Sequence, residues 1–82
     1  MAPIATQNAL MLKNVRAQIT RRAVDSSMLN VTVSGSVVHI TGVLRPLRGF
    51  NVDLRDEMNI ISQILRQRSE IQEVVWDVTL RV

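Results

Sequence analysis

The C-terminal stretch of the chain repeats apolar side chains with a period of two, and this pattern constrains the fold most. The side chains that share one face of it are Val74, Trp76, Val78, Leu80 and Val82. Such a period is typical of a β-strand with one buried face. Residues 28–33 and 37–43 alternate in the same way around Ser34-Gly35-Ser36, which predicts a β-hairpin with a tight turn. A sheet that is apolar on one face needs a second layer to cover that face.

Two segments with helical periodicity can supply this layer. Residues 7–24 carry one apolar stripe, made of Leu12, Val15, Ile19 and Ala23. Residues 53–68 carry a second stripe, made of Leu54, Met58, Ile61 and Leu65, and Asp53 is the predicted N-cap. The predicted fold is therefore α+β. It is an α-β-β-α-β two-layer sandwich with two helices packed on one face of a three-stranded mixed sheet.

The remaining segments are predicted to be irregular. Residues 1–6 form a flexible N-terminal lead with Thr6 as a helix cap, and residues 7–82 form one domain. Residues 44–52 contain a Pro and a Gly and are predicted to be a loop. Gly42, at the end of its strand, suits a bulge or a close backbone approach. Trp76 is predicted to lie buried beneath the helices, because the alternation of the last strand places it on the core face.

Residues 29–42 combine a strand, a polar turn with Gly35 and a strand ending in Gly42. A helix follows, and then Ile71-Gln72-Glu73-Val74 leads into the last strand. This order and these motifs resemble the BON (bacterial OsmY and nodulation) domain family over most of residues 8–82. The family's usual Gly before the last strand is replaced here. The resemblance implies a non-catalytic module of the kind found in bacterial envelope and stress proteins, where phospholipid or protein contact is proposed.

The residue inventory disfavours catalysis. The chain has no Cys and a single His, which excludes thiolate chemistry and leaves little for a Ser-His-Asp triad. Asp53, Asp56 and Glu57 are explained by capping and by the helix dipole without a metal ion. We therefore expect no enzymatic activity, no cofactor and no metal site.

Two surfaces are candidate contact sites. Arg45, Arg48 and Phe50 could meet an anion or a membrane surface, although Leu47 and Phe50 could instead cap the core. The second surface is the sheet face opposite the helices, and its predicted residues are Asn30, Thr32, His39, Thr41, Val75, Asp77 and Thr79. This face and the unblocked last strand could meet a protein partner or a second copy of the chain.

These features favour a non-catalytic interaction module that docks on a protein, on its own copy, or on an anionic phospholipid surface. The alternative is a small nucleic-acid-binding domain that uses its arginines. The net charge of +3 is modest for that role, and the sequence has no Gly-x-x-Gly loop. No stretch is apolar enough to predict a transmembrane segment. The expected location is cytoplasmic for a complete chain, or the envelope or periplasm for a domain of a longer exported protein.

Overall fold

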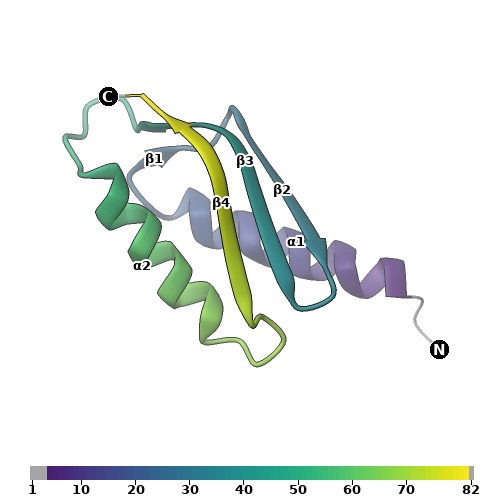
Figure 1. Cartoon of the computed structure of the whole chain (residues 1–82). Coiled ribbons are helices and arrows are strands. Elements are labelled where there is room, and N and C mark those ends of the chain that lie inside the picture. Colours follow the sequence, from purple (N-terminus) through teal and green to yellow (C-terminus); the bar gives the residue numbers. More distant parts are fainter. Residues whose placement is uncertain (1–3, 82) are drawn as a thin grey trace.

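A computed structural model describes residues 4–81 and shows two helices packed on a mixed β-sheet (Figure 1). The elements in chain order are α1 (Ile4–Thr20), β1 (Val24–Asp25), β2 (Leu29–Ser34), β3 (Val37–Pro46), α2 (Leu54–Arg66) and β4 (Glu73–Leu80). The predicted α+β class and the two-layer arrangement are confirmed. The structure adds one short strand, β1, that the sequence pattern did not predict.

Strand β3 is the centre of the sheet. It pairs antiparallel with β2 through a tight turn at Gly35 and Ser36, and it pairs parallel with β4. Helix α2 makes the connection that returns the chain from β3 to its parallel neighbour (Figure 1). The inward side chains of β3 are fully buried because strands flank it on both sides and both helices cover it.

The core is aliphatic, as the composition predicts. Its largest fully buried side chains come from α1, β3 and α2, and they are Val15, Ile19, Val38, Ile40, Leu44, Ile61 and Leu65. Trp76 packs against this cluster on the face that the helices cover, as predicted, but it is only partly buried, so the predicted full burial is wrong. It lies on an edge strand, where its indole N–H donates to the Ser62 hydroxyl of α2 at 2.7 Å.

Helix α1 is shifted relative to its prediction. It begins at Ile4, so Thr6 lies inside the helix and is not its cap. The prediction of a flexible lead at residues 1–6 is therefore wrong for residues 4–6, and residues 1–3 lie outside the described residues. The helix ends at Thr20 and leaves Ala23 outside, because Val24 turns into the sheet and is buried against β3.

A β-bulge joins β1 to β2. Asp25 pairs with Arg45 and Leu29 pairs with Gly42, so residues 26–28 lie opposite only residues 43 and 44. Gly42 has a φ of +110°, and a Cβ atom there would overlap the carbonyl oxygen of Met28. This confirms the close backbone approach predicted at Gly42.

The predicted loop at residues 44–52 is wrong over its first part, because β3 continues to Pro46. The pairing of Val24 with Pro46 is followed by a hydrogen bond from Leu47 N–H to the Ala23 carbonyl, 3.1 Å long. In an antiparallel ladder, hydrogen-bonded and non-bonded pairs alternate, so this pair needs no N–H from the proline. Pro46 is therefore compatible with the end of a strand.

Asp53 caps α2 as predicted, since its side chain accepts hydrogen bonds from the backbone N–H groups of Arg55 and Asp56. Glu57 lies in the first turn of α2, as predicted, and has a second role that the sequence did not reveal. Its carboxylate is buried and forms a bidentate ion pair with the Arg22 guanidinium, with contacts of 2.8 to 3.1 Å. This pair ties the end of α1 to the first turns of α2.

Candidate functional site

The structure brings Arg45, Arg48 and Phe50 together at one end of the molecule. They line an open surface pocket of about 540 Å³, which we call the arginine pocket. Its full lining is Asp25, Arg45, Pro46, Leu47, Arg48, Gly49, Phe50 and Arg81. Three arginines and one aspartate line it, so the pocket carries an excess of positive charge.

Two apolar side chains of this pocket lie in solvent. Phe50 is 55% exposed and Leu47 is 40% exposed. The interpretation that they cap the core is wrong, because Val52 and Leu54 close that end of the core instead. These two side chains leave apolar surface in water next to arginines, and fully burying a Phe side chain is worth about 1.5–3 kcal/mol.

Arg45 is held by an ion pair. Its guanidinium lies 2.6 Å from an Asp25 carboxylate oxygen, and the Ser27 backbone N–H donates to the other Asp25 oxygen at 2.9 Å. Hydrogen bonds from the Ser27 side chain and backbone, together with Arg45, lower the pKa of Asp25 below its ordinary value of 3.8. Asp25 is therefore ionised at neutral pH and competes for Arg45 with any incoming anion.

The bulge at residues 26–28 makes this ion pair possible. If the β2–β3 pairing continued back along the chain without a bulge, Asp25 would lie opposite Pro46 and its side chain would point to the inward face of the sheet. The extra residue shifts the register, so Asp25 lies opposite Arg45 on the outward face.

Arg81 joins the pocket through the register of β4. Its backbone N–H donates to the Leu44 carbonyl at 2.9 Å, one residue beyond the last β3–β4 pair. The period of two therefore puts Arg81 on the same face as Arg45. The alternation of residues 74–82 was a signal that could have revealed Arg81 as a site residue. No local signal could have revealed Asp25, because its direction depends on the bulge.

The second predicted surface, the outward sheet face, is present as predicted. Asn30, Thr41 and Asp77 form one cross-strand row, and Thr32, His39 and Val75 form the next. Thr79 lies on the same face opposite Val43, and neither helix covers these rows because both pack on the other face. His39 is exposed, and within residues 4–81 no hydrogen bond or ion pair connects it to Asp77.

Two further features bear on the chemistry of the chain. Within the described residues, no three His, Asp or Glu side chains gather as a metal site would require. Neither described helix is long and apolar enough to span a bilayer.

No protein-family model, no curated protein and no solved structure matches this chain.

Proposed function

We propose that the chain is a non-catalytic module that docks on an anionic phospholipid surface through the arginine pocket. The main support for this proposal is that Phe50 and Leu47 are both exposed in a pocket that is also lined by Arg45, Arg48 and Arg81. In a docked state, the guanidinium groups would meet lipid phosphates while the two apolar side chains enter the boundary between headgroups and acyl chains. The BON-like element order is consistent with this role and belongs to the same proposal.

Electrostatic attraction and the burial of apolar surface both favour this docked state. Each arginine near an anionic membrane contributes about 1 kcal/mol of binding free energy, and the contribution weakens with added salt. Insertion of Phe50 adds a salt-independent contribution, because it removes apolar surface from water. Arg45 contributes less than Arg48, since Asp25 already neutralises much of its charge.

A nucleic acid is the competing occupant, and the pocket composition favours lipid. Arginines can bind the phosphates of either ligand. The exposed aliphatic side chain of Leu47 would gain no contact from a phosphate backbone, which is charged and hydrated. Single-stranded nucleic acids are bound on platforms of several aromatic side chains. Phe50 is the only aromatic residue of this pocket.

Vesicle flotation tests the proposal with phosphatidylglycerol mixed into phosphatidylcholine, and with phosphatidylcholine alone as the neutral control. We expect binding to the anionic vesicles only, weakened about tenfold by Phe50→Ala and about fivefold by Arg48→Ala. Arg66→Ala is the matched control, because Arg66 is an exposed arginine at the far end of α2 and should change binding much less. Equal losses in the Arg48 and Arg66 variants, or retention of the wild-type protein by an RNA column but not by vesicles, would contradict lipid docking.

A further inference from the structure

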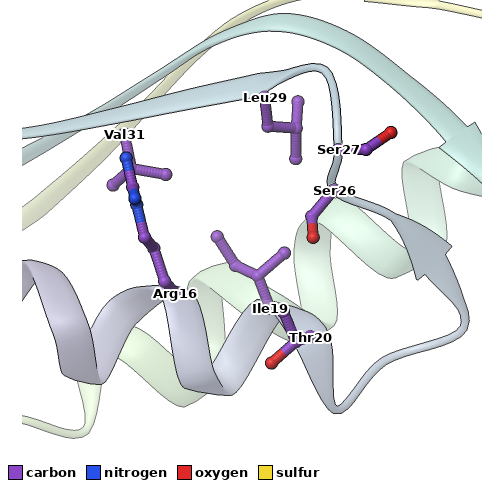
Figure 2. A pocket seen from close by; sticks show the side chains of 7 residues that line it. All are labelled: Arg16, Ile19, Thr20, Ser26, Ser27, Leu29 and Val31. Atoms are coloured by element: carbon purple, nitrogen blue, oxygen red, sulfur yellow. The ribbon is translucent and has the colours of Figure 1, made fainter.

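A second pocket opens between α1 and the bulged edge of the sheet, away from the outward sheet face. It has a volume of about 250 Å³. Its lining is Arg16, Ile19, Thr20, Ser26, Ser27, Leu29 and Val31. Figure 2 shows Arg16 rising from α1 along one wall, Ser26 on the opposite wall, and Ile19 between them. The Ser26 side chain points into the gap, and the Ser27 side chain points away from it.

The polar groups of this pocket divide into those already in use and those available for a ligand. The Thr20 hydroxyl donates a hydrogen bond to the Ala17 carbonyl at 3.0 Å, and Ser27 is hydrogen-bonded to the Asp25 carboxylate. The Arg16 guanidinium and the Ser26 hydroxyl have no hydrogen bond or ion pair within residues 4–81. Two donors with free capacity therefore flank a gap whose base is apolar.

We propose that this pocket binds a small amphipathic monoanion, specifically a carboxylate attached to a short aliphatic chain. The Arg16 fork matches a carboxylate, and a lone arginine neutralises one negative charge. Ser26 can donate to the same head group, while Ile19, Leu29 and Val31 offer aliphatic surface to the chain. The volume equals that of about eight liquid waters, which suits a ligand the size of hexanoate.

The site is separate from the arginine pocket. The two pockets have no lining residue in common: Asp25 lines the arginine pocket, and Ser26 lines this one. Lipid docking depends on Arg45, Arg48 and Phe50, whereas the carboxylate site depends on residues of α1, the bulge and β2. The two proposals therefore fail independently.

An NMR titration of the backbone amides with hexanoate tests the inference. We expect saturable shifts at Thr20, Ser26, Ser27 and Leu29. Acetate has the charge without the chain, and 1-hexanol has the chain without the charge, so both should bind at least about tenfold more weakly. Tighter binding of hexyl phosphate than of hexanoate would overturn the assignment of the head group.

Matched variants locate the binding. Arg16→Ala should weaken hexanoate binding about tenfold or more, because a charge-assisted hydrogen bond is lost. Arg21→Ala, on another exposed arginine close to the end of α1, should leave hexanoate binding unchanged, and so should Phe50→Ala in the arginine pocket. The inference fails if hexanoate causes no shifts, if Arg16→Ala binds it like the wild type, or if the shifts map to the arginine pocket.

Discussion

Two of the ion pairs within residues 4–81, Arg22–Glu57 and Arg45–Asp25, use the same chemical groups for opposite purposes. Arg22 and Glu57 form a bidentate pair around a carboxylate whose side chain is 5% exposed, and they join the turn that follows α1 to α2. Arg45 and Asp25 form a pair whose side chains are 43% and 27% exposed, and they lie at the rim of a surface pocket. The first pair stabilises the fold, and the second holds a cation that solvent can reach.

The difference comes from the cost of desolvation. A buried carboxylate that loses its partner keeps its desolvation penalty, so its partner matters greatly for stability. An exposed pair contributes little, because water and salt replace the partner. Four predictions test this comparison and the bulge that places Asp25 opposite Arg45.

Arg22→Ala should have the largest effect and destabilise the domain by about 3 kcal/mol, because Glu57 would remain buried without its partner. We take the lower end of the usual range, since the Arg22 side chain is 34% exposed and water can reach the gap. Urea unfolding monitored by Trp76 fluorescence measures the change. Arg21→Ala is the control, and an equal loss in both variants would show that the Glu57 pair has no special role.

Gly42→Ala should come next, with a loss of about 2 kcal/mol, because φ at this position is +110° and the Met28 carbonyl occupies the site of the new Cβ atom. Gly35→Ala is a matched control, since its φ is also positive but no atom lies within 4 Å of the added Cβ. We expect about 1 kcal/mol there. If the two variants unfold at the same urea concentration, the contact between an added Cβ at position 42 and the Met28 carbonyl does not destabilise the fold, and this prediction is wrong.

Asp25→Asn should change stability least and function most. The amide retains an oxygen for the Ser27 N–H but releases the charge of Arg45, so affinity for anionic vesicles should rise about fivefold. Flotation at neutral pH measures this gain. A fall in affinity would mean that Asp25 orients Arg45 for the ligand and does not compete with it.

The stability difference between the wild type and Asp25→Asn should depend on pH. The pKa of Asp25 is lower in the folded state, so its contribution to stability is present above its ordinary value of 3.8 and is lost as pH falls below it. The stability difference between wild type and Asp25→Asn should therefore stay constant from neutral pH down to about pH 5 and shrink below pH 4. Urea titrations at several pH values measure it, and a difference that shrinks already between pH 7 and pH 5 would contradict the lowered pKa.

The candidate site could be predicted only in part. Arg45, Arg48 and Phe50 were identified from residue chemistry alone, because arginines beside a turn-forming Pro and Gly are a local signal. The exposure of Phe50 was not predictable, since it depends on Val52 and Leu54 filling the end of the core first.

By itself, the sequence determined the local periodicities and the features that depend on short stretches of neighbouring residues. These are the α+β class, the hairpin around Gly35, the N-cap at Asp53, the close approach at Gly42 and the outward direction of His39. Each depends on the spacing of neighbouring residues, which a helix or strand converts directly into a face.

Only the tertiary structure decided which distant groups meet. One extra residue between β1 and β2 turned Asp25 outward to Arg45, and the packing of α1 on α2 turned Glu57 inward to Arg22. The place of β4 at the sheet edge left Trp76 half-buried. These outcomes depend on strand register and layer order, which are set by contacts between residues far apart in the chain and leave no local pattern.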